Sequence, residues 1–354
     1  MKSIFHIITT INRGGAENQL LVLVSEQIRK GYRVSVIYLK GEPELKEEFI
    51  NLGAEVIESV SKLSTVVQPL AIAKLISKRN VVLHAHLPRA ELVCLVIPAR
   101  FILITSRHNA EPFFPGAPKL LSNLLARLVE VRARKIIAIS ESVSDFLIQR
   151  GEVRNSQKVK VIHYGYQINN RNRAEPLTRN GGSSKLGTVS RLAEQKDLPT
   201  MIKAFQGFRS CVQDATLSIV GAGPLESDLR DLVKSLNCEN QVFFLGRRHD
   251  VLSFLGSLDV FLLTSKYEGF GMVLLEAMDA GVPIVASRNT AIAEVLGPDF
   301  PGLCETGNSI DFTAKTLKLQ DSKYKEAILK IQEKRLVLFQ ASSMVEKVID
   351  SYSA

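Results

Sequence analysis

The sequence predicts an α/β protein made of two doubly wound domains in tandem. Short apolar runs rich in β-branched residues alternate with longer segments of helical period, which is typical of parallel sheets covered by helices. One polar stretch without a period, residues 168–184, interrupts this rhythm and is rich in Asn, Arg, Gly and Ser, as interdomain linkers are. The length of 354 residues also favours two domains over one.

Each predicted domain has its own series of strands. In the first domain, residues 1–167, we expect strands at 3–9, 33–39, 55–58, 81–85, 102–106, 135–139 and 159–162. In the second domain, residues 185–334, we expect strands at 185–190, 215–220, 241–245, 260–263 and 283–286. Residues 16–30 carry an apolar stripe and predict a helix that ends at Gly31. The tail is helical by composition, and we expect residues 335–354 to form a C-terminal helix that packs back on the first domain.

Ligands of doubly wound sheets bind beyond the carboxyl ends of the strands. Two such domains that face each other across a cleft would therefore suit a reaction between two substrates. The cysteines, Cys94, Cys211, Cys238 and Cys304, form no C-x-x-C pair, which favours a reduced, cytoplasmic protein. Because no metal-ligand spacing is present, we expect neither a metal nor another cofactor. The apolar run at residues 1–8 is too short for a signal peptide. The apolar run at residues 92–105 is too short for a helix that spans a membrane.

The excess positive charge lies in the first half of the chain. Residues 1–170 contain 23 Lys and Arg against 14 Asp and Glu, whereas the rest contains 22 of each. A basic half favours anionic partners, such as a phosphorylated acceptor or an anionic membrane surface, although an ordinary solubilising surface has the same composition. Nucleic acid is disfavoured because no DNA- or RNA-binding motif accompanies the charge.

The most informative segment is Lys266–Met278, which follows the strand at 260–263 and opens a helix. Glycines at 269 and 271 let the backbone approach a ligand closely, and the start of a helix favours an anion. Glu268 lies in the loop and Glu276 lies inside the helix, where a carboxylate can accept both hydroxyl protons of a ribose diol. A helix-capping acid at 268 and a surface glutamate at 276, neither of them in contact with a ligand, would give the same sequence pattern.

This segment resembles the glutamate-x7-glutamate motif of retaining GT-B glycosyltransferases, in particular glycosyltransferase family four. The family pattern continues into a Gly-x-Pro strand, matched here by residues 280–287, Ala-Gly-Val-Pro-Ile-Val-Ala-Ser. The resemblance covers residues 4–348 and is strongest in 186–296. It implies the GT-B fold and a retaining, hexosyl-type transfer from a nucleotide sugar, with UDP as the expected nucleotide. The expected acceptor is a hydroxyl of a saccharide or lipid-linked molecule in bacterial polysaccharide, lipopolysaccharide or capsule assembly, which fits the basic first half of the chain.

Residues 187–198 resemble the family's G-R-L-x-x-x-K-G segment, whose cations bind the donor diphosphate. Arg191 and Lys196 occupy the cationic positions, while Ser190 and Asp197 replace the glycines. A metal-free site must stabilise a leaving diphosphate with fixed cations, and this pair would provide them. We favour front-face retention, in which the leaving diphosphate helps to deprotonate the acceptor.

The remaining site residues rest on the same resemblance. Gly14 and Gly15 match the family's N-terminal glycine loop, His108 matches a histidine that contacts the transferred sugar, and Tyr164 replaces the usual Asn. We expect His84 and His86, on either side of Ala85, to point to opposite faces. The predicted catalytic residues are His108, Glu268, Arg191 and Lys196. The predicted donor-binding residues are Gly14, Gly15, Arg191, Lys196, Gly221, Gly223, Arg247, Gly269, Phe270, Gly271 and Glu276.

Other enzymes and binding proteins share this fold. A sugar-nucleotide epimerase, a phosphorylase and a non-catalytic nucleotide-sugar sensor remain alternatives. Product analysis with a labelled donor would separate them.

Residues 117–135 combine an apolar stripe with five basic residues. Leu121, Leu124, Leu125 and Leu128 recur at helical spacing, and Phe113 and Phe114 precede them. A helix that packs on its own sheet has this pattern, as does a helix that rests on anionic lipid. The second interpretation predicts a peripheral protein at the inner face of the cytoplasmic membrane.

Overall fold

A computed structural model describes residues 3–77, 80–168 and 184–353. The predicted linker at 168–184 lies almost entirely outside these described residues. The chain divides into two compact units, the first made of Met1–Gln167 with Phe339–Ala354 and the second of Ile168–Leu338. Each unit is described by itself.

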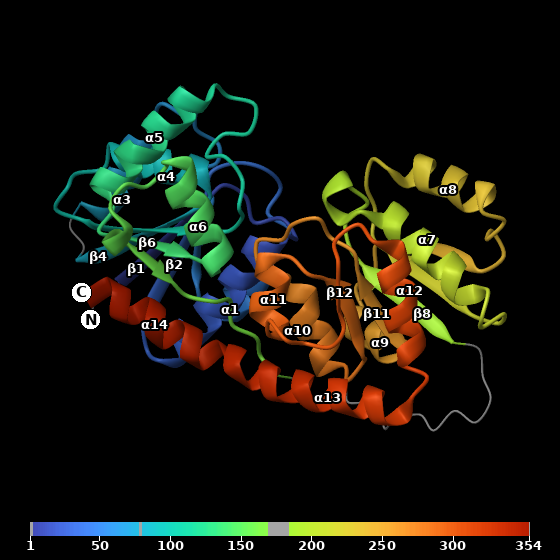
Figure 1. The fold of residues 1–354 in the computed structure, drawn as a ribbon. Coiled ribbons are helices and arrows are strands. Elements are labelled where there is room, and N and C mark those ends of the chain that lie inside the picture. The colour runs from blue at the N-terminus through green and yellow to red at the C-terminus, as the bar shows by residue number, and fades with distance from the viewer. Residues whose placement is uncertain (1–2, 78–79, 169–183, 354) are drawn as a thin grey trace. The chain divides into compact units, whose positions relative to one another are not determined.

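The first unit has a sheet of seven parallel strands in the order β3-β2-β1-β4-β5-β6-β7 (Figure 1). All the strands predicted for this half are present, and each end lies within one residue of its prediction. Their bounds are β1 Ser3–Ile8, β2 Arg33–Tyr38, β3 Glu55–Ile57, β4 Val81–His86, β5 Ile102–Arg107, β6 Lys135–Ala138 and β7 Val159–Val161.

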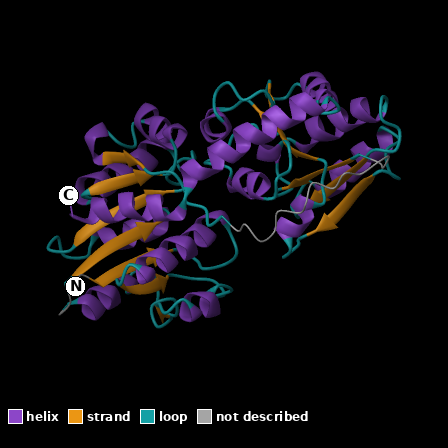
Figure 2. Cartoon of the chain, turned by 90° about the horizontal axis from the view of Figure 1, so that it is seen from below, coloured by secondary structure: helices purple, strands orange, loops and turns teal. Residues whose placement is uncertain are grey.

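Helices cover both faces of this sheet (Figure 2). They are α1 Gly15–Arg29, α2 Lys46–Asn51, α3 Gln68–Ile76, α4 Pro88–Leu95, α5 Lys119–Arg132, α6 Glu141–Arg150 and α14 Ala341–Ser353, with a 3₁₀ turn at Ser156–Lys158. The last of these, α14, packs beside α1 although the two are at opposite ends of the chain.

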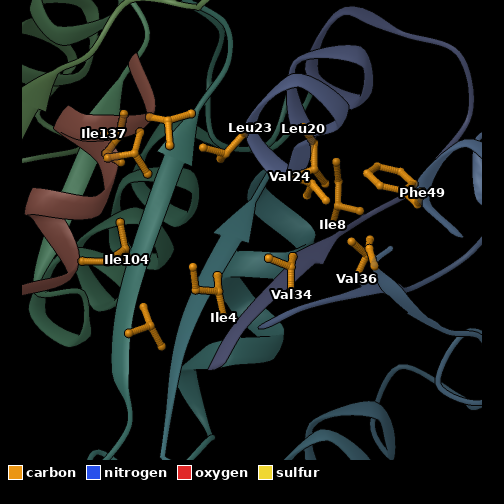
Figure 3. Packing of buried hydrophobic residues seen from close by; sticks show 14 of the residues in the cluster. Ile4, Ile8, Leu20, Leu23, Val24, Val34, Val36, Phe49, Ile104 and Ile137 are labelled. Atoms are coloured by element: carbon orange, nitrogen blue, oxygen red, sulfur yellow. The ribbon is translucent and has the colours of Figure 1, made fainter. Parts of the chain in front are cut away.

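The core of the first unit has two layers because successive strand residues point to opposite faces. On one face, Ile4 and Ile8 of β1 pack against α1 and α14 (Figure 3). On the other face, Phe5 and Ile7 pack against α3 and α4. The central strands therefore bury apolar side chains on both faces, and the face under α1 and α14 also contains the buried histidines His6, His84 and His86.

The second unit has a six-stranded parallel sheet in the order β10-β9-β8-β11-β12-β13. Its strands are β8 Lys185–Val189, β9 Thr216–Val220, β10 Val242–Gly246, β11 Val260–Leu263, β12 Ile284–Ser287 and β13 Leu303–Cys304. Its helices are α7 Leu198–Arg209, α8 Glu226–Ser235, α9 Val251–Gly256, α10 Met272–Asp279, α11 Thr290–Leu296, α12 Ser309–Lys318 and α13 Ser322–Leu336, with 3₁₀ turns at Glu194–Lys196 and Val337–Phe339. The strand β13 was not predicted, since two residues are too few to show a period.

Both sheets are doubly wound, and the strand order fixes where a ligand can bind. The order reverses between β1 and β4 in the first sheet and between β8 and β11 in the second. Ligands of such sheets bind at this reversal, beyond the carboxyl ends of the strands. The loops that follow β1, β5, β8 and β11 contain most of the predicted site residues.

Candidate active site

The loop between β11 and α10 contains the glycines of the predicted motif. Gly271 caps α10 with a φ of +90°, a left-handed conformation that glycine adopts without strain. The Phe270 side chain is only 2% exposed, so it anchors the loop in the core. A ligand contact from residue 270 would therefore come from its backbone.

Lys196 and Glu268 form an ion pair at the carboxyl edge of the second sheet. The Lys196 Nζ lies 2.6 Å from Glu268 Oε1, and the Ser265 hydroxyl donates to the same oxygen at 2.7 Å. The Thr264 hydroxyl donates to the Lys196 carbonyl at 2.9 Å. This network brings together two residues that lie 72 positions apart in the sequence, and both were predicted to be catalytic.

Asp197 occupies the position where the family pattern has a glycine. Its φ is +46°, in the left-handed region that favours glycine and that Asp tolerates. The carboxylate accepts a hydrogen bond from the Thr200 hydroxyl at 2.8 Å. The replacement therefore keeps the backbone turn.

Glu276 lies partly buried in α10. Burial raises the pKa of its carboxyl group, because a charged carboxylate loses hydration there. Within the described part of the chain, this side chain has no hydrogen-bond or ion-pair partner. A ligand with paired hydroxyl groups would supply the donors that the carboxylate lacks.

The two glycines of the Gly-x-Gly-Pro segment allow close packing between loops. A Cβ at Gly221 would lie 1.9 Å from the Ser190 carbonyl oxygen, and one at Gly223 would lie 2.3 Å from the Leu192 carbonyl oxygen. These glycines therefore position the loop that contains Arg191.

Arg191 and Arg247 are both exposed. Among the described residues, neither guanidinium group has an ion-pair or hydrogen-bond partner. Each follows a strand, β8 for Arg191 and β10 for Arg247. Both groups are therefore available to an anionic ligand.

In the first unit, Gly14 and Gly15 open α1 directly after the loop that follows β1. A Cβ at Gly14 would lie 2.5 Å from Glu17 Oε2, and the Thr10 hydroxyl donates to Glu17 Oε1 at 2.9 Å. The glycine thus makes room for a side chain that ties the helix to the end of β1.

Both ring nitrogens of His108 have hydrogen-bond partners. Nε2 lies 3.1 Å from Nδ1 of His86, and Nδ1 lies 2.5 Å from the Tyr164 hydroxyl. Burial lowers the pKa of His108 to about 3, so the ring is neutral. Tyr164, which replaces the family's Asn, therefore still forms a hydrogen bond at the site.

The prediction that His84 and His86 point to opposite faces is wrong. Their ring centroids lie 4.2 Å apart, on the face covered by α1 and α14. Residues two apart in a strand share a face, because side chains alternate with a period of two.

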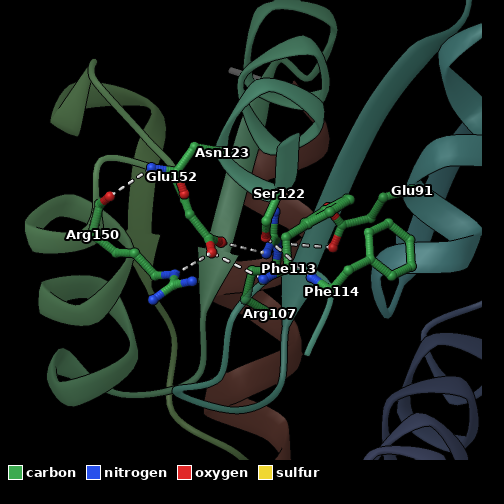
Figure 4. A network of polar contacts seen from close by, with 8 residues as sticks. All are labelled: Glu91, Arg107, Phe113, Phe114, Ser122, Asn123, Arg150 and Glu152. Atoms are coloured by element: carbon green, nitrogen blue, oxygen red, sulfur yellow. Dashed lines mark hydrogen bonds and ion pairs between the residues drawn. The ribbon is translucent and has the colours of Figure 1, made fainter. Parts of the chain in front are cut away.

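A buried ion network, which was not predicted from the sequence, holds the loop after β5 (Figure 4). The Arg107 guanidinium lies 2.9 Å from Glu91 and 3.3 Å from Glu152. It also stacks on the Phe113 ring at 4.4 Å, and Glu152 accepts from the Phe113 amide at 2.9 Å. The network fixes the residue before His108. It could be found only from the fold, since its members are far apart in sequence.

One group of side chains in the described residues has the spacing of a metal site, namely His6, His84 and His86. None of these residues was predicted as a ligand. They lie inside the first unit under α1 and α14.

Two family models together match almost the whole chain. The model described as Glycosyltransferase Family 4 matches residues 13–169, and the one described as Glycosyl transferases group 1 matches residues 169–335. The chain belongs to glycosyltransferase family four. Its fold is GT-B, the fold of solved structures to which it is similar. One of them, Anabaena HepE in complex with UDP-glucose, has a TM-score of 0.83 over all of both chains at 21% identity.

The chain is also similar to two named bacterial proteins over part of their length. The N-acetyl-alpha-D-glucosaminyl L-malate synthase of Bacillus anthracis is 28% identical over 67% of this chain and 65% of that protein. An N-acetylgalactosaminyltransferase of Campylobacter jejuni, named for a diphospho-undecaprenol acceptor, is 31% identical over 40% of this chain and 38% of that protein. The chain therefore matches less than two thirds of each of these relatives.

Proposed function

We propose that this protein is a retaining glycosyltransferase that moves a hexosyl group from a UDP-sugar to a hydroxyl acceptor. The observation that supports this most directly is the arrangement after β8 and β11. There the Lys196–Glu268 pair lies at one sheet edge, and Glu276, a carboxylate that has no partner among the residues that the structure describes, follows in α10. Family membership and the UDP-glucose complex of the Anabaena relative support the same donor.

We assign the donor diphosphate to Arg191 and Lys196, and the ribose hydroxyls to Glu276. Charge develops on the leaving diphosphate in the transition state, and preorganised cations stabilise it there more than in the ground state. Glu268 would then contact sugar hydroxyls while it orients Lys196, and His108 would contact the transferred sugar. We expect the diphosphate to leave from the same face of the sugar that the acceptor attacks, without a covalent intermediate and without a metal.

The acceptor that we favour is a saccharide or a lipid-linked sugar of bacterial surface polysaccharide assembly. The basic first half of the chain supports an acceptor that contains phosphate. The relative from Campylobacter jejuni is named for such an acceptor.

We further propose that α5 rests on an anionic membrane surface, at the inner face of the cytoplasmic membrane. The helix faces its own unit with Ser122, Asn123, Ala126, Val129 and Glu130, whereas Leu120, Leu124, Leu128 and Val131 are 48–86% exposed. In the predicted stripe, Leu121, Leu124 and Leu128 are exposed, so the packing interpretation is wrong for them. Leu125 packs against the buried cluster of Phe113, Ala126 and Val129, as that interpretation expects. Among the described residues, no helix is both long and apolar enough to cross a bilayer.

The lipid interpretation also needs correction in its details. Phe113 is fully buried beneath Arg107 and cannot reach lipid. Arg132 donates to the Phe101 carbonyl, and Lys135 donates to the Gln157 carbonyl. We therefore assign lipid contact to the leucines and to the exposed cations near the ends of α5, Lys119 and Arg134.

A binding screen and product analysis test the proposed activity. UDP-, GDP- and ADP-sugars would be compared by thermal shift, because a ligand that binds only the folded state raises the melting temperature. A hit labelled in its sugar is then incubated with acceptors. Transfer with the anomeric configuration kept supports the proposal, whereas an epimerised donor, a sugar 1-phosphate formed from a polysaccharide or binding without turnover contradicts it.

A further inference from the structure

A continuous hydrogen-bonded chain of side chains runs beneath α1 from Gln27 to His108. His6 Nε2 lies 2.8 Å from Gln27 Oε1, and His6 Nδ1 lies 2.9 Å from His86 Nε2. The other nitrogen of His86 lies 3.1 Å from His108 Nε2. The three rings come from β1, β4 and the end of β5, which are neighbours in the sheet.

Burial keeps these rings neutral. It lowers the pKa of His6 to about 4 and that of His86 well below its ordinary value, because an imidazolium loses its hydration there. A neutral imidazole has one N–H donor and one acceptor nitrogen. Each ring in the chain must therefore donate at one nitrogen and accept at the other.

The direction in which the rings donate their hydrogen bonds follows from the Gln27 end of this hydrogen-bonded chain. An amide oxygen can only accept, so His6 carries its proton on Nε2 and accepts at Nδ1. His86 must then donate from Nε2, and His108 must donate from Nε2 to His86 Nδ1. The remaining nitrogen of His108, Nδ1, is left as an acceptor for the Tyr164 hydroxyl. All three rings hold the same tautomer.

The Gln27 amide is itself held in place on its other side. Its nitrogen donates to the Tyr352 hydroxyl at 3.0 Å, and that hydroxyl lies 2.8 Å from His84 Nδ1. The second nitrogen of His84 lies 2.7 Å from the Ser106 hydroxyl. Hydroxyls and imidazoles can reverse their roles, whereas an amide cannot unless it rotates. A rotation of Gln27 would reverse both branches together.

We propose that Gln27 is a positioning residue that sets the tautomer of His108 through two intervening imidazoles. The consequence for catalysis rests on the proposed function. With Nδ1 as the acceptor, His108 selects a sugar substituent that can donate a hydrogen bond, a hydroxyl or an amide N–H, in place of the Tyr164 hydroxyl. A sugar that carries only an acceptor at that position is disfavoured.

The same histidines could be taken for a metal site. The hydrogen-bonded chain argues against one, because the nitrogens of His6, His84 and His86 that would bind a cation already have partners.

The test is the ¹⁵N spectrum of the imidazole rings in the full-length protein, in which protonated and unprotonated nitrogens are distinct. The variants are Gln27→Met and the matched control Gln68→Met. Gln68 is also fully buried, but it donates to the Leu39 carbonyl and takes no part in the hydrogen-bonded chain of histidines. In the wild type and the control, His108 should be protonated at Nε2 alone. In Gln27→Met, both nitrogens of His108 should be partly protonated.

A second variant, Gln27→Glu, tests the direction of each branch and does not depend on Gln27→Met folding. A carboxylate still accepts from His6 but cannot donate to Tyr352. His108 should therefore keep its proton on Nε2, while His84 moves its proton from Nε2 to Nδ1. A His108 tautomer that is the same in Gln27→Met, or a wild-type proton on Nδ1, would overturn the inference, as would stoichiometric zinc binding that removes these signals.

These spectra need no substrate, so they are independent of the proposed activity. A tautomer that shifts as expected while the transfer rate stays constant supports the role of Gln27. The same result overturns the sugar contact of His108.

Discussion

The ammonium group of Lys196 lies 2.6 Å from the carboxylate of Glu268, and both side chains are largely buried. The pair arises because the loops after β8 and β11 lie side by side at the point where the strand order reverses. A diphosphate that binds Lys196 would share the cation with Glu268. The carboxylate thus holds the ammonium group in place before the donor arrives and limits its freedom afterwards.

Replacing Lys196 with Met should lower kcat by about 100-fold or more, as the loss of one preorganised charge-stabilising group does in other enzymes. Arg191→Met should act in the same direction. Steady-state kinetics with the donor identified by the screen would measure both. Lys234→Met, on the exposed surface of α8, is the control and should be unchanged. Equal rates in all three variants would refute the assignment of the diphosphate.

Glu276→Gln should weaken nucleotide binding by roughly 10- to 100-fold, since hydrogen bonds to a charged group contribute about 1.5–3 kcal/mol. Calorimetry with UDP and with its 2′- and 3′-deoxy analogues would show whether the loss comes from the ribose. The variant should bind the deoxy analogues as well as the wild type does. If Glu276→Gln loses the same factor with every analogue, the carboxylate does not contact the diol. Glu239→Gln, in an exposed turn, is the control.

Except for the two-residue β13, the strands of both sheets could be predicted because their apolar runs are short, β-branched and bounded by polar residues. The site loops could be placed because they follow those strands. The histidine chain could not be found, since β1, β4 and β5 become neighbours only through strand order. The Arg107 network could not be found either, since Glu91 of α4 and Glu152 after α6 reach β5 only through the packing of these elements. The stripe on α5 was ambiguous for another reason. Periodicity shows that a helix has an apolar face, but the polar residues Ser122 and Glu130, which face the unit, decide where that face points.

Turnover should persist in excess EDTA at the rate seen without it. The proposed stabilisation of the leaving group comes from Arg191, Lys196 and the start of α10, so a chelator removes nothing that the reaction needs. Rates would be measured after dialysis against EDTA and again with added Mn²⁺ or Mg²⁺. Loss of activity that manganese restores would refute metal independence.

Stability should fall as the pH drops from about 7 toward 4. Burial holds the pKa values of His6, His84, His86 and His108 below 6.5, so in this range the unfolded chain binds protons that the folded chain does not. Each such histidine costs up to about 1.4 kcal/mol per pH unit. Glu91 and Glu276 oppose this trend, because burial raises the pKa of both carboxyl groups, that of Glu91 to about 7, but they are two groups against four.

Urea unfolding at pH 7.5, 6.5 and 5.5 would measure this effect. His6→Gln should unfold with a smaller pH dependence than the wild type, because one depressed pKa is removed. His249→Gln is the control, since that histidine is exposed. A free energy of unfolding that is constant across this range would contradict the inference that these four histidines are neutral in the folded protein.

Replacing Leu120, Leu124, Leu128 and Val131 with Gln should abolish binding to anionic vesicles while the fold is kept. These side chains are exposed, so the substitutions remove no core contacts, whereas each leucine that enters lipid would contribute about 1.5–3 kcal/mol. Lys119→Gln with Arg134→Gln should weaken binding by about 1 kcal/mol per charge and reduce its dependence on salt.

Arg127 and Arg132 are unsuitable for this test because they donate to backbone carbonyls. The control is Ile310→Gln with Val337→Gln, two exposed apolar residues of the second unit. Co-sedimentation that is equal on neutral and anionic vesicles, or equally reduced in the control, would rule out α5 as the membrane contact.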